Sequence, residues 1–197
     1  MCRLHFPERH DETSAMEVRE KYIARLMSEP WQQNFTAIKF VHMPQIVVNP
    51  WVRQRCQYLC NHTRQSDLCP PFSASAEDTL NVLGDYKFGL MIRREEPFPF
   101  TRQTSEVWGD FQNALVEVEN ESFIRGYGKA FALATGNCVF CHHDDAIRPC
   151  EFNGKRRPTL EAIGINLYDT LDMIGWRELL FREPDDPFNL FGLLLLE

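Results

Sequence analysis

Six of the seven cysteines in this chain of 197 residues fall into two groups with nearly the same spacing. Two thiolates separated by two or three residues can face one point, and a third that arrives after a longer loop can close a cage around it. Unrelated buried cysteines do not explain a final gap of eight residues that occurs in both groups. We therefore expect all six to bind metal, in a first triad, Cys56-x3-Cys60-x8-Cys69, and a second triad, Cys138-x2-Cys141-x8-Cys150.

Thiolate ligands restrict the kind of metal. They are soft ligands that suit zinc, copper(I) and iron–sulfur clusters, and they bind magnesium and calcium poorly. Six cysteines can hold two 4Fe–4S clusters with three thiolates each, or one cluster with four thiolates and two spare thiols. We expect one or two 4Fe–4S clusters. The alternative is structural zinc, held by Cys56, Cys60, Cys138 and Cys141, or by each triad together with a histidine.

Charged and polar residues accompany both triads. His142 and His143 directly follow Cys141, so either is a candidate fourth ligand, although such histidines are more often only polar loop residues. Cations beside a negatively charged cluster would stabilise it, but solvated surface charge explains them equally well. Acids near the second triad are candidate proton carriers, although helix caps and loop charge account for them more simply. The cations are Arg53, Arg55, Arg64, Lys155, Arg156 and Arg157, and the acids are Asp144, Asp145 and Glu161.

The charge and hydropathy of the chain argue against several classes of protein. The net charge of −7, from 21 basic and 28 acidic residues, disfavours nucleic-acid binding, because phosphate contacts need clustered lysine and arginine. No segment approaches the roughly 18 apolar residues that span a membrane, and the charged N-terminus lacks the apolar core of a secretion signal. A cytoplasmic location follows as the default, and there clustered cysteines more often bind metal than form disulfides.

Hydrophobic periodicity predicts interleaved helices and strands. Ser75, followed by Glu77 and Asp78, is typical of a helix N-terminus, and Gly136 is expected to end a long helix. We expect helices over residues 14–27, 75–83, 104–135, 159–163 and 167–174, strands over 37–41, 46–48, 86–92 and 190–196, and cysteine-rich loops over 50–74 and 137–158.

These elements combine into an α+β or α/β fold. We expect a small mixed sheet with flanking helices, and two cysteine-rich metal-binding loops brought together in space. The length suits one domain. We therefore expect a flexible N-terminal arm over residues 1–13 and a single metal-binding domain over residues 14–197.

Six short motifs along the chain occur together in one known family. They are Arg53-x2-Cys56-Gln57-Tyr58-x-Cys60, Cys69-Pro70-Pro71, Gly126-Tyr127-x-Lys129-Ala130-Phe131-Ala132-Leu133, Gly136-x-Cys138-x2-Cys141, Arg157-Pro158-x-Leu160-Glu161-Ala162-x-Gly164-Ile165 and Phe191-Gly192-Leu193. Over residues 35–197 the chain resembles a family of predicted metal-binding proteins, the domain of unknown function 2284. The family has Tyr-Gly and Lys between the last two cysteines of the first triad, where this chain has residues 61–68 without glycine. The resemblance implies cysteine-bound metal and names no reaction.

The observations predict a metal-binding protein with one of three roles. Full thiolate ligation of an iron–sulfur cluster suits electron transfer as an oxidoreductase with a redox partner protein. An iron with an open position acts as a Lewis acid on a small-molecule substrate, which suits sulfur or dehydration chemistry. Structural zinc instead indicates a module for protein interaction. No nucleotide-binding glycine loop, Gly-x-Ser-x-Gly or His-Glu-x-x-His motif supports another enzyme class.

Overall fold

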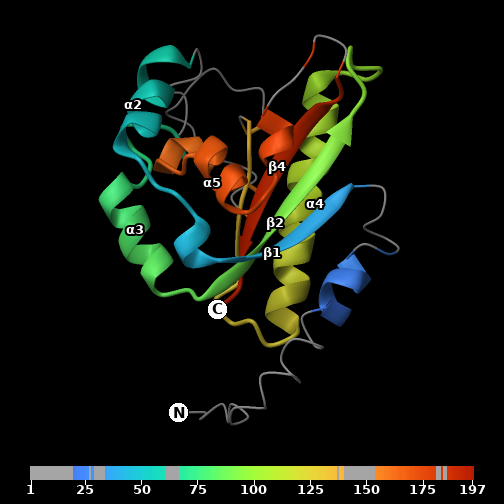
Figure 1. Cartoon of the computed structure of the whole chain (residues 1–197), viewed down its shortest axis with the longest axis horizontal. Coiled ribbons are helices and arrows are strands. Elements are labelled where there is room, and N and C mark those ends of the chain that lie inside the picture. The colour runs from blue at the N-terminus through green and yellow to red at the C-terminus, as the bar shows by residue number, and fades with distance from the viewer. Residues whose placement is uncertain are drawn as a thin grey trace.

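A four-stranded antiparallel sheet forms the centre of the protein (Figure 1). The structure, a computed structural model, describes residues 20–26, 28, 34–60, 67–136, 138–139, 154–180, 183 and 186–197. The described strands are β1 (Ala37–His42), β2 (Phe88–Glu96), β3 (Phe131–Leu133) and β4 (Phe188–Leu195), in the spatial order β1-β2-β4-β3. Each described pair of neighbouring strands is antiparallel, so the expectation of a mixed sheet was wrong.

Helices cover both faces of the sheet (Figure 1). Helix α4 lies on one side, and α2, α3 and α5 lie on the other. The described helices are α2 (Pro50–Leu59), α3 (Ala76–Gly84), α4 (Thr104–Ile124) and α5 (Leu167–Met173), with short 3-10 helices η2 (Met43–Gln45), η3 (Glu161–Ile163) and η4 (Arg177–Leu180). Among the residues that the structure describes, no helix is both long enough and apolar enough to cross a membrane.

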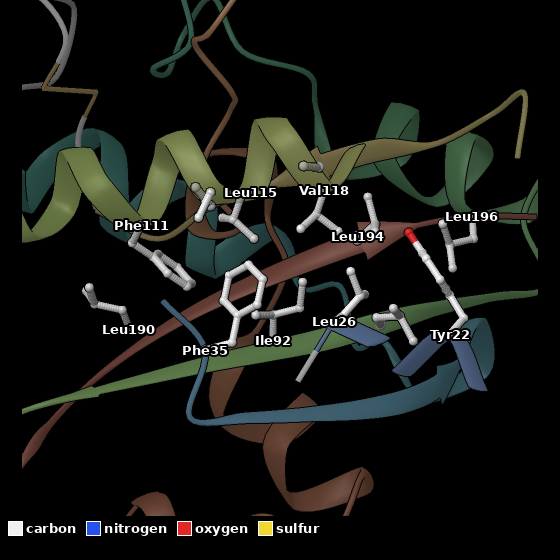
Figure 2. Close-up of a cluster of buried hydrophobic side chains, with 14 of the residues drawn as sticks. Tyr22, Leu26, Phe35, Ile92, Phe111, Leu115, Val118, Leu190, Leu194 and Leu196 are labelled. Carbon is white, nitrogen blue, oxygen red and sulfur yellow. The ribbon is translucent and has the colours of Figure 1, made fainter. Parts of the chain in front are cut away.

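The two faces of β2 build two separate hydrophobic cores, because successive side chains of a strand point to opposite faces. Leu90 and Ile92 pack with α4, whereas Met91 packs on the other side. Figure 2 shows Phe111 and Leu115 of α4 directed towards the sheet in the first core. Gly192 of β4 lets α4 approach closely, since a Cβ there would lie 2.7 Å from the methyl groups of Leu115.

Several expected elements are confirmed. Residues 20–26 are helical, and β1, β2 and β4 lie where strands were expected, with β2 continuing to Glu96. The predicted start of the helix near residue 75 is also confirmed. The Ser75 hydroxyl accepts a hydrogen bond from the Asp78 backbone at 3.0 Å, and the Asp78 carboxylate accepts one from the Ser75 backbone at 3.2 Å. This reciprocal capping satisfies N–H groups that the helix leaves unpaired.

The expectation of a loop over residues 50–74 was wrong for its first part, because residues 50–59 form helix α2. Pro50 occupies the first turn, where its missing N–H and restricted φ suit a helix. The expected strand over 46–48 was also wrong. Only Val48 forms a bridge, to Ile165, and this bridge ties the start of α2 to the segment after η3.

The expected helix over 104–135 was wrong beyond Ile124. Gly126 adopts a positive φ of 99°, which ends the helical path, and the chain returns to the sheet as β3. Strand β3 pairs with β4, so the backbone groups of these residues bond across the sheet and not along a helix. Gly136 therefore follows a strand and does not cap a helix.

The expected arm over residues 1–13 lies outside the described residues. The same is true of most of the second cysteine-rich loop, including Cys141 and Cys150, and of His142 and His143.

Candidate metal centre

Helix α2 presents the first two cysteines on one face. Cys56 and Cys60 are four residues apart, which is about one helical turn. Helix α2 ends at Leu59, and Cys60 follows as its C-cap with an extended backbone, whose N–H donates to the carbonyl of Cys56 at 3.3 Å. A bonded turn thus holds the two cysteines at a short separation along α2.

Arg53 ties the third cysteine of the first triad to the same helix. Its guanidinium donates to the backbone carbonyls of Pro71, Ser73 and Ala74 at 2.8, 3.0 and 3.0 Å. These carbonyls belong to the turn that Cys69 begins, in which the Cys69 carbonyl accepts a hydrogen bond from Ser73 at 3.0 Å. Arg53 therefore holds the turn that follows Cys69 against the helix that carries Cys56.

Helix η3 packs against α2 and brings an acid to the same region. The hydroxyl of Ser73 donates to the Ala162 carbonyl at 2.7 Å, and that of Thr79 donates to the Ile163 carbonyl at 2.8 Å. These bonds set the position of Glu161, the first residue of η3. Its charge contributes to raising the pKa of Cys56. Glu161 was expected near the second triad, and the structure brings it to the first.

Cys138 enters from the end of β3 by way of a glycine. Gly136 has a positive φ of 77°, and a Cβ at this position would overlap the indole ring of Trp108 on α4. Only glycine meets both requirements without strain. The chain therefore passes close over α4 just before Cys138, and a residue with a side chain would redirect it.

The structure places Cys69 of the first triad within electrostatic range of Cys138, the first cysteine of the second triad. Burial and the neighbouring thiolates of Cys60 and Cys69 raise the pKa of Cys56 to about 11, from an ordinary value of 9.0. Burial, followed by the charges of Cys60 and Cys138, raises the pKa of Cys69. Such effects are strong only over about 10 Å or less. The thiol of Cys69 thus lies close enough to one cysteine of its own triad and to one of the second triad for their charges to act on it.

The donors fit a metal by their chemistry. Cys56, Cys60, Cys69 and Cys138 are partly buried thiols, and burial together with neighbouring cysteine charges raises the pKa of Cys56 and of Cys69. A cation among these thiols would offset the repulsion and favour the thiolates. As they stand, the side chains of the described residues include no group of three or more His, Cys, Asp and Glu arranged to hold a metal ion. Of the six predicted ligands, Cys56, Cys60, Cys69 and Cys138 belong to the described part of the chain.

Three of the flanking arginines hold the site together, a role that the sequence did not suggest. Arg53 binds carbonyls, as described above. Arg156 forms a two-point ion pair with Asp67, two residues before Cys69, with one contact of 2.9 Å. Arg157 pairs with Glu119 of α4 at 2.7 and 2.6 Å. The segment after the second triad is thereby anchored to the first triad and to α4.

A cleft of about 640 Å³ borders the first triad. Cys56, Cys60 and Glu161 lie in its wall together with Trp51 and Arg55 of α2. Burial raises the pKa of the Glu161 carboxyl. Sequence reasoning missed the cleft because it treated α2 as a loop. The helical spacing of Trp51, Arg55 and Leu59, four residues apart, was the signal that places them on one stripe beside the cysteines.

The stretch that carries these elements matches a known family. The model of the DUF2284 family, described as a predicted metal-binding protein, matches residues 39–196. The chain belongs to this family. Membership in DUF2284 confirms the resemblance seen in the motifs and supports metal binding as the general function. All six cysteines of the triads lie within the matched residues. No curated protein and no solved structure matches the chain.

Proposed function

We propose that the two triads form one joint centre that holds iron and sulfur as one or two 4Fe–4S clusters. The observation that carries this proposal is the proximity of Cys69 to both Cys60 and Cys138, which lie close enough for their charges to contribute, after burial, to raising the Cys69 pKa. Thiolates from both triads would then face a shared site. The family description supports metal binding, and the cysteine-only donor set favours a soft metal.

Iron–sulfur is favoured over zinc by the number of cysteines. A single structural zinc is complete with four thiolates, which Cys56, Cys60, Cys69 and Cys138 would already supply. Cys141 and Cys150 would then have no role, although they repeat the spacing of the first triad. Two three-thiolate clusters use all six cysteines. Zinc remains the second candidate because a closed four-thiolate set satisfies it.

The cleft beside the cysteines favours a metal centre that binds a small molecule over one that only transfers electrons. A cluster with one iron free of protein ligands supplies a Lewis acid for an oxygen or sulfur atom of a substrate. Cys56 and Cys60 border the cleft, so a molecule bound there would approach the centre directly. Glu161, with its raised pKa, can hold a proton in the cleft wall beside Cys56.

The proposal is tested by metal and acid-labile sulfide analysis of protein purified without oxygen. We expect roughly four or eight irons per chain with matching sulfide, and a broad absorption band near ~400 nm. A cluster with an open iron should change its electron paramagnetic resonance spectrum when candidate ligands are added. A colourless protein with one or two zinc ions and no sulfide would overturn the iron–sulfur proposal in favour of structural zinc.

A further inference from the structure

We infer that the cleft beside Cys56 and Cys60 binds an organic anion with an aromatic body. The inference rests on the proposed function, because such a molecule would be the substrate class that the metal centre meets. The volume of about 640 Å³ suits a small organic molecule, since such sites usually enclose roughly 300–1,000 Å³.

The walls of the cleft are unusually apolar for an exposed surface. Trp51 and Leu59 of α2 are 49% and 72% exposed, and Tyr168 of α5 is 60% exposed. Trp108 of α4 and Phe191 of β4 line the same space. Large apolar side chains gathered around one concave site mark it as a binding surface, and aromatic rings favour stacking with a flat partner.

Arg55 supplies a cation for the ligand. Every other arginine in the described part of the chain makes an ion pair or donates to a backbone carbonyl, whereas Arg55 does neither. Its guanidinium is exposed and lines the cleft next to the stripe that carries Trp51 and Leu59. Arginine binds carboxylates with two parallel hydrogen bonds, so an anionic group fits this position.

The other polar side chains of the cleft wall also favour a ligand that accepts hydrogen bonds. The side chain of Asn166 is fully used, because its oxygen accepts from the N–H of Asp169 at 3.2 Å and its amide N–H groups donate to Asn49 and Asp169 at 2.9 and 2.6 Å. The oxygen of Asn189 is used by the guanidinium of Arg93 at 2.7 Å, whereas its amide N–H groups find no acceptor in the described part of the chain. Arg55 and the amide of Asn189 therefore remain as donors that an anion satisfies and a cation does not.

Glu161 orients the bound molecule. It is the acid among the described residues that line the cleft, and it lies on the side of Cys56. An anionic group would avoid this carboxylate and turn towards Arg55.

Calorimetric titration with two probes of similar shape tests the inference. The probes are 2-naphthoate and the neutral 2-naphthalenemethanol. We expect the full-length protein to bind the carboxylate at least about tenfold more tightly than the alcohol, as a charge-assisted pair predicts. The variant Arg55→Gln should bind the two probes equally. Arg125→Gln, which removes an exposed arginine beyond the far end of α4, should behave like the unaltered protein.

A second variant tests the aromatic wall. Trp51→Ala should weaken binding of both probes by about tenfold while it keeps the preference for the carboxylate, because the wall acts on the naphthalene ring. Three results would overturn the inference: equal affinity for the two probes, no effect of Arg55→Gln, or no saturable binding of 2-naphthoate.

Metal content measured on the same samples separates this inference from the proposed function. If the protein lacks iron and sulfide but binds 2-naphthoate through Arg55, the proposed function fails and the anion cleft stands. If iron and sulfide are present but the carboxylate has no advantage over the alcohol, the cleft inference fails alone.

Discussion

Glu119 of α4 and Arg157 form a two-point ion pair in which both side chains are nearly buried, at 12% and 13% exposure. The same carboxylate accepts the backbone N–H of Ala132 in β3 at 2.6 Å. One side chain therefore holds α4, β3 and the segment that follows the second triad. Because Arg156, the neighbouring residue, binds Asp67, this anchor also reaches the loop of the first triad.

Removing one partner of this ion pair should weaken the fold. We expect Glu119→Gln to lower the free energy of unfolding by about 3 kcal/mol, because an uncompensated, largely buried guanidinium remains. Urea unfolding followed by circular dichroism measures the change. Glu117→Gln, an exposed position on the same helix, should change stability by less than about 0.5 kcal/mol. Equal stability of the two variants would show that the pair does not anchor the segment.

Replacing Gly136 by a residue with a side chain should destabilise the fold. Gly136→Ala places a Cβ against the Trp108 indole and forces a positive φ on alanine, so we expect a loss of at least about 2 kcal/mol. Metal content should fall as well, because Cys138 lies only two residues further along the chain. Gly84→Ala at the end of α3, where a Cβ meets nothing within 4 Å, is the comparison and should be neutral or slightly stabilising. Thermal unfolding and iron analysis of both variants test this prediction.

If the two triads form one joint centre, replacing a cysteine of either triad should reduce the metal bound by both. Cys69→Ser and Cys138→Ser should each reduce the metal content of both triads, because Cys69 is coupled to Cys138. Cys2→Ser, outside the triads, should leave the metal content unchanged. Metal and sulfide per chain are the measurements. Loss of half of the metal in each of the two triad variants would instead indicate two independent sites.

In the metal-free protein, the thiol of Cys56 should lose its proton at a higher pH than an ordinary cysteine thiol does. Burial and the charges of Cys60 and Cys69 raise its pKa to about 11. The folded protein therefore keeps this proton at a pH where the unfolded chain has already released it. The contribution of Cys56 to stability is full below its ordinary pKa of 9.0 and is lost as the pH rises from about 9 to about 11.

Alkylation by iodoacetamide, followed by mass spectrometry, measures this titration. The rate at Cys56 should reach half its maximum near pH 11 in the folded, metal-free protein and near pH 9 in urea. A midpoint near pH 9 in both states would contradict the crowded, partly buried thiol environment. Metal-loaded protein should be protected at both values of pH, because bound thiolates do not react.

Local signals in the sequence predicted the elements whose stabilising contacts lie nearby in the chain. Ser75 and Asp78 cap α3 with each other, three residues apart, so their spacing alone indicated the helix start. The apolar run that became β4 could only be buried, and β4 now lies in the middle of the sheet. The long helix was predicted too far because β3 is only three residues long and depends on pairing with distant β4.

The sequence by itself determined the donor chemistry of this protein, because the spacing and type of six cysteines select soft metals wherever the loops lie. It also determined membership in a metal-binding family. Only the tertiary structure decided that Cys69 lies within electrostatic range of Cys138, that Glu161 lies near Cys56, and that Arg55 lines a cleft. These relations join residues that are tens of positions apart. They depend on how α2, η3 and α4 pack on the sheet, and periodicity along one segment carries no information about such packing.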